Sequence, residues 1–412
     1  MKPSPRSSST VRGLAPGSSA GCLALALVTL GIGAVGFGLP ERAQAQSLMA
    51  REGLGLPIDP LGARARGLGS AGIGLTGWNV SPMDPAASAG LGLPSISASL
   101  RPATTTLTDG REAGFTRFPT LAVSYPLGAN VFSVQAGSFF DQEWEVRLER
   151  TLVLGGEEVP ALDVYRSDGG IGRVQVGWAR RIVPSLAVGM TFGTHVGTIE
   201  RSFTRTIQAT GQVSEDFGAF GVRGRLRASG VLAGVGAIWD PLPLVRVGGS
   251  VIWSDDLTLE PSGSDADVSG EYSVPLQLHG GGTVGLTQDL SLHLSGAYAD
   301  WSDINEDLEQ AASKGATWSY GGGVEWGGST VLGRTFPLRL GARHRDLPFE
   351  SGGAAAFERT LSGGFGLNLV EVEGEEDPRA RSDLGVERGT REGGLLSESF
   401  WRITFTVRIS SG

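Results

Sequence analysis

The 412-residue chain contains 65 glycines and only 19% charged residues, and its formal net charge is −9. This acidic balance argues against a nucleic-acid-binding protein, which needs a basic surface to neutralise phosphate. The abundant glycine lowers helix propensity and permits bulges, tight turns and close backbone approach.

The first 45 residues have the three parts of a secretory signal peptide. Basic residues, an apolar core and a small-residue cleavage pattern follow one another: Lys2, Arg6 and Arg12, then residues 22–37, then Ala43-Gln44-Ala45. We therefore expect residues 1–45 to be removed, with an uncleaved anchor helix as the alternative. Removal takes away Cys22, the only cysteine, and with it disulfides, cysteine-ligated zinc and thiol catalysis.

Residues 46–92 form a glycine-rich segment that fits no strand pattern. Its stretch 64–91 reads RARGLGSAGIGLTGWNVSPMDPAASAGL and has no acidic residue before Asp84. Asp84-Pro85-Ala86 has the composition of a turn, because aspartate and proline both favour turn conformations. The segment is expected to end there and lead into a different kind of structure.

From residue 93 onward, apolar and polar residues alternate with a period of two, which indicates β-strands. The last segment is the clearest case, with Trp401, Ile403, Phe405, Val407 and Ile409 on one face and Arg402, Thr404, Thr406 and Arg408 on the other. Fourteen such strands are predicted, near 94–103, 118–126, 130–141, 170–182, 185–199, 217–239, 243–253, 274–286, 289–301, 317–327, 335–345, 357–369, 382–390 and 399–409.

Three features favour a membrane barrel over a soluble sandwich. Many segments have the roughly 9–13 residues that cross a bilayer at a tilt. Aromatic residues lie near segment ends, where they could form interfacial girdles: Tyr125, Trp178, Trp239, Trp253, Tyr298, Trp301, Trp318 and Trp401. Tight turns alternate with long polar connections, at 142–169, 200–216, 254–273 and 302–316, although the acidic connection 370–381 is long where a short turn is due.

The predicted fold is therefore all-β, a transmembrane antiparallel β-barrel of about fourteen strands formed by residues 93–412. Hydrocarbon offers no hydrogen-bonding partner, so a sheet in the membrane must close on itself. Fourteen strands enclose a lumen wider than side chains alone can fill, since about eight strands is the size that they fill. We expect residues 46–92 to occupy that lumen as a plug.

The same residues resemble a known family. The stretch 63–72, ARARGLGSAG, followed by Asp84-Pro85-Ala86, is similar to the N-terminal hatch of the FadL-type transporters of hydrophobic compounds and of their PorV-type relatives. Parts of the C-terminal half, such as 339–343 (RLGAR) and 362–366 (SGGFG), resemble the superfamily more loosely. On this resemblance the hatch residues are Arg64, Arg66, Gly67, Gly69, Gly72, Asp84, Pro85 and Ala86. Asp84 stands where that family usually has asparagine.

Strand alternation directs a set of basic residues into the predicted lumen: Arg173, His195, Arg246, His279, His293, Arg339, Arg343 and Arg402. The arginines could bind a cargo carboxylate or form a charge ladder with lumenal acids and plug carbonyls. The inward histidines could form a metal site or a proton-sensitive gate, or simply be tolerated polar residues, and His344 is expected to face outward. No spacing indicates a metal site, a cofactor or a catalytic constellation, so we expect a protein that is not an enzyme.

The resemblance implies passive uptake of hydrophobic compounds, such as long-chain fatty acids, across the bacterial outer membrane. The expected partners are then outer-membrane lipids and a hydrophobic small-molecule cargo. The alternative is a PorV-like barrel that anchors or shuttles secreted proteins without transporting solutes. A general diffusion porin is a third hypothesis, disfavoured because a porin needs no plug.

Overall fold

The computed structural model describes residues 47–75, 77, 79–107, 110–154, 156–207, 220–262, 269–308, 315–331, 333–372 and 378–411. The predicted signal peptide, Cys22 and the first residue after the cleavage site lie outside these residues. The described residues all belong to one compact unit, which spans Ala43–Gly412.

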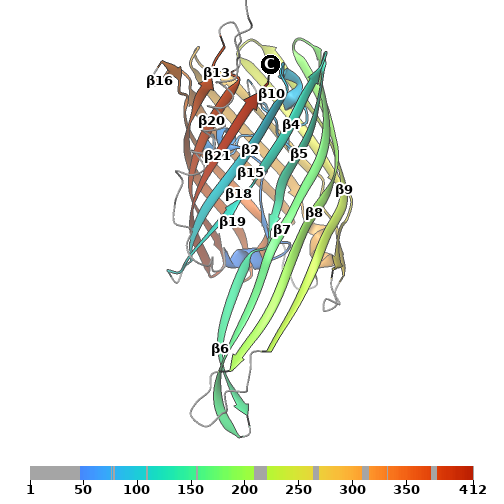
Figure 1. The fold of residues 1–412 in the computed structure, drawn as a ribbon, viewed down its shortest axis with the longest axis vertical. Helices are drawn as coiled ribbons and strands as arrows, with labels where there is room; N and C mark the ends of the chain where they lie inside the picture. Colours follow the sequence, from blue (N-terminus) through green and yellow to red (C-terminus); the bar gives the residue numbers. More distant parts are fainter. Residues whose placement is uncertain are drawn as a thin grey trace, which may run out of the picture. The chain divides into compact units, whose positions relative to one another are not determined.

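A closed antiparallel barrel of fourteen strands forms the wall of this unit, as the sequence predicts (Figure 1). The barrel closes where the first strand pairs with the last, with Ile96 opposite Ile409. The wall strands follow one another in chain order: β2 (Ser95–Leu107), β3 (Glu112–Arg117) with β4 (Thr120–Leu127), β5 (Asn130–Asp141), β7 (Glu157–Val183), β8 (Leu186–Ile207), β9 (Phe220–Leu242), β10 (Val245–Ser254), β13 (Gln277–Gly285), β14 (Leu290–Asp300), β15 (Ala316–Trp326), β18 (Leu338–Ser351), β19 (Ala354–Val370), β20 (Ala380–Gly393) and β21 (Leu396–Ser410).

The two ends of the barrel differ in their connections. Tight turns such as 128–129 and 184–185 gather at the end that carries the C-terminus, at the top of Figure 1. This end also carries the small hairpin of β16 (Thr330–Val331) and β17 (Arg334–Thr335). The opposite end carries β11 (Leu257–Pro261), β12 (Gly270–Tyr272) and α3 (Ser302–Asp307). Following the general arrangement of such barrels, we name the tight-turn end periplasmic and the other end extracellular.

The prediction of a polar loop at 142–169 is wrong. Strand β6 (Trp144–Leu154) pairs along its whole length with the first part of β7, and β7 continues to pair with β8 as far as Ala161 opposite Ile207. Together with β9, these strands project from the extracellular end as a sheet, at the bottom of Figure 1. Their alternating charges resemble a solvated loop in the sequence because neither face of the projecting sheet lies against lipid.

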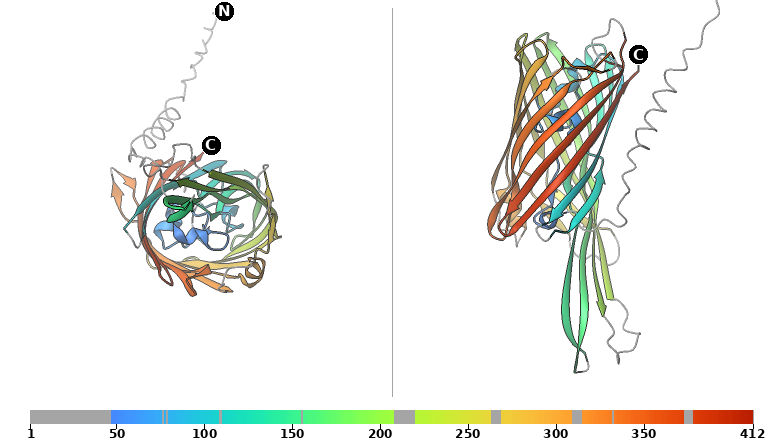
Figure 2. Two further views of the ribbon diagram at one scale, coloured as in Figure 1. Left: turned by 90° about the horizontal axis from the view of Figure 1, so that it is seen from below. Right: turned by 90° about the vertical axis from the view of Figure 1, so that its left-hand side faces the viewer.

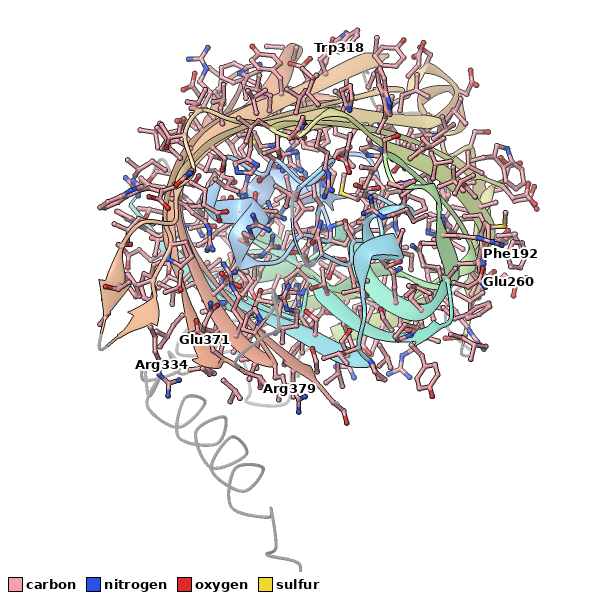
Figure 3. All side chains as sticks on the ribbon, turned by 90° about the horizontal axis from the view of Figure 1, so that it is seen from above. Phe192, Glu260, Trp318, Arg334, Glu371 and Arg379 are labelled. Atoms are coloured by element: carbon pink, nitrogen blue, oxygen red, sulfur yellow. The ribbon has the colours of Figure 1, made fainter. Side chains whose placement is uncertain are left out.

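The outer face of the wall is apolar. Exposed side chains there include Leu340 (68%) and Leu361 (69%), and Phe192 and Trp318 point away from the barrel in Figure 3. Tyr125, Trp239, Trp253 and Trp401 are likewise exposed. Trp301 differs from its predicted position in a girdle, because it is buried and packs edge-on against Phe140, with 5.6 Å between ring centroids.

The described residues of the segment 47–92 lie inside the barrel, in blue in Figure 2. They contain η1 (Leu48–Arg51), β1 (Leu56–Pro57), the one-turn helix α2 (Ala63–Gly67) and η2 (Ala87–Gly90). At the extracellular end Ser47 Oγ donates a hydrogen bond of 2.6 Å to Glu398, and near the periplasmic turn 184–185 Ala86 packs against Ala187. The segment therefore runs along the lumen from one end to the other. No helix among the described residues is long and apolar enough to cross a membrane.

Candidate functional site

The segment 47–92 rests on glycines of the barrel wall. Gly321 and Gly341 face inward from β15 and β18, and a Cβ added to either would overlap backbone atoms of Gly69. Gly69 itself has a φ of +68°, a left-handed conformation that favours glycine. Gly385 of the wall is similarly restricted, because a Cβ there would overlap the carbonyl oxygen of Ala63 in the segment. The backbones of segment and wall thus approach more closely than any larger residue would allow.

Ion pairs and hydrogen bonds tie the same part of the segment to the wall. Arg64 donates two hydrogen bonds to Glu325, at 3.0 and 2.7 Å, in a bidentate arrangement. Arg66 is 2% exposed and lies 3.7 Å from Glu387. The hydroxyl group of Ser362 on β19 links the wall to the segment, because it donates a hydrogen bond to the carbonyl of Gly67 and accepts one from the N–H of Gly69.

Arg339, Arg343 and Arg402, predicted to face inward, lie in a network of buried ion pairs. Arg339 binds Glu325 and Asp383, while Arg343 binds Asp59 of the segment. Arg402 donates to Glu358, which also accepts hydrogen bonds from Arg345 and Arg391. Arg246 forms an ion pair with Asp240 and also donates a hydrogen bond of 3.1 Å to the carbonyl of Leu75 in the segment. Each of these arginines therefore has an anionic partner inside the barrel.

The remaining predicted hatch residues serve the packing of the segment. A Cβ on Gly72 would overlap the side chain of Leu61 within the segment. The carbonyl of Pro85 lies against Gly189 of the wall, and Ala86 is buried against Ile238. The side chain of Asp84 is buried and accepts a hydrogen bond of 3.1 Å from the backbone N–H of Gly74.

Burial raises the pKa of Asp84 to about 6, although backbone N–H groups and Arg246 oppose the shift. Its ordinary pKa is near 3.8, so the docked segment binds a proton more tightly than the released segment does. The free energy that holds the segment in the lumen is therefore most favourable below about pH 4. It becomes less favourable as the pH rises toward 6 and is constant above that.

We expect Asp84→Asn to remove this pH dependence, because the amide resembles the protonated carboxyl group and still accepts from Gly74. At pH 7.5 the variant should hold the segment more tightly than the native chain. Hydrogen exchange of residues 79–90 at pH 4.5 and 7.5 measures the effect. Equal protection of the native chain at both pH values would contradict the assignment.

Of the three inward histidines, His195 and His293 form hydrogen bonds within the wall, whereas His279 lines the cavity described below. His195 contacts Ser254 at 2.8 Å and stacks on Phe139, and His293 lies between Thr283 and Ser291 at 2.8 and 2.9 Å. Among the described residues, no group of three or more histidine, cysteine or acidic side chains could hold a metal ion. His344 lies on the outer face, stacked between Tyr320 and Phe357.

A cavity of about 110 Å³ lies between one part of the segment and the wall. Its lining combines apolar side chains with polar and charged ones. The apolar ones include Ile58, Leu61, Ile73, Met83, Phe139, Ala297, Ala299 and Trp301, and the polar ones are Asp59, Ser70, Arg173, Gln277, His279, Ser295, Thr317, Ser319, Arg343, Arg345 and Asp346. Small-molecule sites usually combine apolar side chains with placed polar groups. A cavity of roughly 150 Å³ holds a benzene molecule in other proteins.

Arg173 differs from the other arginines that the sequence predicts to face the lumen. It is 3% exposed, its guanidinium lies 4.2 Å from the centre of the Phe139 ring, and it forms no ion pair with a carboxylate of the described residues. Its Nε has no hydrogen-bond partner there either. Burial of a cation without a paired anion is costly, so this side chain is suited to receive an anion that enters the cavity.

The wall is interrupted beside this cavity. Pro119 cannot donate to a ladder, and strand pairing breaks there: β4 pairs with both β2 and β5, whereas β3 pairs only with β2. Because β3 does not pair with β5, the end of β5 beyond β4 has a free edge on this side. Strand β1 of the segment pairs with that edge, with Pro57 opposite Phe140. A groove of about 400 Å³ opens outside this interruption, lined in part by Phe118, Gly137 and Ile58. The segment therefore completes the wall at this point.

No family model and no curated protein matches the chain. Solved structures of the same fold do match. The Ralstonia pickettii toluene transporter TbuX superposes with a TM-score of 0.55 at 12% identity, over 85% of this chain and 98% of that one. A Pseudomonas aeruginosa FadL homologue gives 0.55 at 12% identity, over 87% and 98%, and the CymD monoaromatic hydrocarbon channel gives 0.54 at 14% identity, over 85% and 97%.

These likenesses establish the fold, and they agree with the resemblance read from residues 63–72 and 84–86. A closed barrel with an apolar outer face satisfies every backbone group within a bilayer and is the architecture of bacterial outer-membrane proteins. The chain is therefore an outer-membrane β-barrel with the fold of the FadL-type transporters.

Proposed function

We propose that the protein takes up hydrophobic compounds passively across the outer membrane, and that residues 46–92 act as its plug. The observation that carries this proposal is the cavity between segment and wall, which contains the unpaired Arg173. The solved structures that share its fold include a toluene transporter and a monoaromatic hydrocarbon channel, and this supports a hydrophobic cargo.

Long-chain fatty acids are the cargo that fits Arg173 best. A guanidinium binds a carboxylate through two parallel hydrogen bonds. The cavity of about 110 Å³ has room for the carboxylate and the first carbons of an acyl chain, so the rest of the chain would lie outside it. The groups opposite, Asp59 and Arg343, already neutralise each other as an ion pair. Arg173 is thus the cation available to the cargo head group.

Arg173→Gln tests this assignment. We expect the apparent affinity for oleate to fall about tenfold or more, because a hydrogen bond to a charged group contributes roughly 1.5–3 kcal/mol. Binding of toluene, which has no carboxylate, should stay unchanged. Isothermal titration of the detergent-purified chain with each compound measures both.

Arg166→Gln is the matched control, because Arg166 lies on the same strand but is exposed and pairs with Asp168. It should alter neither affinity. If Arg173→Gln binds oleate as tightly as the native chain does, the carboxylate site is wrong while hydrophobic uptake stays open.

The interruption of the wall beside Pro119 offers the cargo an exit to the side. Only β1 covers β5 there, through a two-residue ladder and the hydrogen bond of 2.7 Å from Ile58 N to Phe139 O. Arg117 bridges the gap with an ion pair of 2.7 Å to Asp141. A shift of these few residues would join the cavity to the groove outside.

The projecting sheet of β6 to β9 supports a second candidate, a PorV-like barrel that holds a secreted protein. Aromatic rings line part of it, with Tyr165 4.8 Å from Phe203 and Phe203 6.5 Å from the exposed Phe220. Native mass spectrometry of the purified barrel separates the two functions. Co-purified fatty acid supports uptake, whereas a stoichiometric bound protein lost on truncating the projecting sheet supports the alternative.

A further inference from the structure

The outer face of the barrel carries a large groove, away from the lumen. It is open to the outside, has a volume of about 1640 Å³ and extends across the strands from β10 to β20. Small outward-facing residues form its floor, namely Gly280, Gly282, Gly296, Gly322 and Ala342, and larger apolar side chains such as Leu294, Leu340 and Leu361 flank it. Glycines on this face have no lumenal role, because their missing side chains would point toward lipid.

Two arginines lie at the end of this groove that is formed by β19 and β20. Arg359 and Arg388 are both exposed on the outer face and both line the groove. Arg388 stands opposite Leu361, and Arg359 stands opposite Thr390, two residues further along β20. Diagonal neighbours of this kind lie roughly 7–8 Å apart in a sheet, so one phosphate group could contact both guanidinium groups.

Neither guanidinium has an anionic partner among the described residues. Arg359 lies over the ring of Phe357 at 4.7 Å and Arg388 over that of Trp401 at 5.1 Å. Two outward carboxylates lie on adjacent strand positions: Asp346, which accepts a hydrogen bond from the N–H of Trp318, and Glu392, which stands opposite Phe357. A cation on the lipid-facing side of a barrel is destabilising unless an anion meets it.

Both arginines lie closer to the extracellular than to the periplasmic end of their strands. Arg359 follows the extracellular turn 352–353 by six residues, and Arg388 precedes the turn 394–395 by six. The stacked aromatic rings agree with a position near the membrane interface. An anion that reaches this site from the bilayer would therefore belong to the outer leaflet.

We propose that this groove binds a phosphorylated lipid of the outer leaflet, with its acyl chains on the glycine floor and its phosphate between Arg359 and Arg388. Guanidinium groups bind phosphate bidentately. The groove exceeds the roughly 300–1,000 Å³ of most small-molecule pockets, as a lipid with several chains requires. The site is separate from the cargo cavity, and occupancy would anchor the β18–β20 side of the wall in the membrane.

Native mass spectrometry of the full chain tests the proposal with dioleoyl phosphatidic acid and with dioleoylglycerol, which differ only in the phosphate group. We expect the phosphorylated lipid to be retained selectively. The double variant R359Q/R388Q should weaken its retention at least about tenfold, since two charge-assisted contacts are lost. The variant should still fold, because removing charge from a lipid-facing surface is favourable.

R223Q/R227Q is the matched control, since it removes the same charge from the exposed part of β9 outside the groove. It should retain the phosphorylated lipid as the native chain does. Equal retention by R359Q/R388Q, equal binding of dioleoylglycerol, or displacement of the lipid by an excess of inorganic phosphate would each overturn the proposal.

Discussion

Gly321→Val is expected to dislodge the lumenal segment and open the barrel to water-soluble molecules. Any Cβ at this position overlaps the carbonyl oxygen of Gly69, and valine adds two further methyl groups. The wall itself tolerates the change, because valine is a favourable strand residue. A fourteen-strand lumen without its filler approaches porin dimensions, so sugar permeability in a liposome-swelling assay should rise about tenfold or more.

Gly280→Val is the control for this experiment. Gly280 faces outward on β13, and a Cβ there meets no atom within 4 Å. The control should behave as the native barrel does. If Gly321→Val were equally impermeable and its residues 64–69 equally protected from proteolysis, close packing against the wall glycines would not hold the segment.

The second large effect is expected at the buried ion-pair network. Glu358 is 1% exposed and contacts Arg345, Arg391 and Arg402. Glu358→Gln keeps the shape of the side chain but leaves three buried cations without their shared anion. Removing one partner of a buried ion pair destabilises a protein by roughly 3–5 kcal/mol. The temperature at which the folded band disappears in a gel-shift assay should fall clearly below that of the native barrel.

Glu158→Gln provides the comparison, because Glu158 is exposed on the projecting sheet. Surface substitutions of this type change stability by about 0.5 kcal/mol or less. If the two variants unfolded at the same temperature, the network would contribute little and the inward arginines would need another role.

Strand positions could be predicted from the sequence because lipid imposes a strict rule on the outer face. The alternation of Trp401, Ile403 and Phe405 with Arg402 and Thr404 fixes both the strand and the side that each residue faces. The same rule directed Arg339 and Arg402 into the lumen. It fails where no lipid is present, which is why the sequence of residues 142–169 indicates a loop although the structure contains strands there.

The partners inside the barrel could not be predicted. Which acid meets which arginine depends on strand register and on the path of the segment, so nothing near Arg402 in the sequence points to Glu358. Inward and outward glycines likewise look the same in the sequence, although Gly321 contacts the segment and Gly280 faces lipid. The sequence predicts Arg173 as one of several lumenal cations, and only the cavity beside it distinguishes it from the paired arginines.

The most direct test of the plug is the conductance of single barrels in planar bilayers, compared between the full chain and a variant lacking residues 47–83. If the segment plugs the lumen as proposed, the full chain should be almost silent and the deletion variant should show a large, steady, unselective conductance. A full chain that is constitutively open, or a deletion variant that is as closed as the full chain, would contradict the proposal that residues 46–92 plug an uptake barrel.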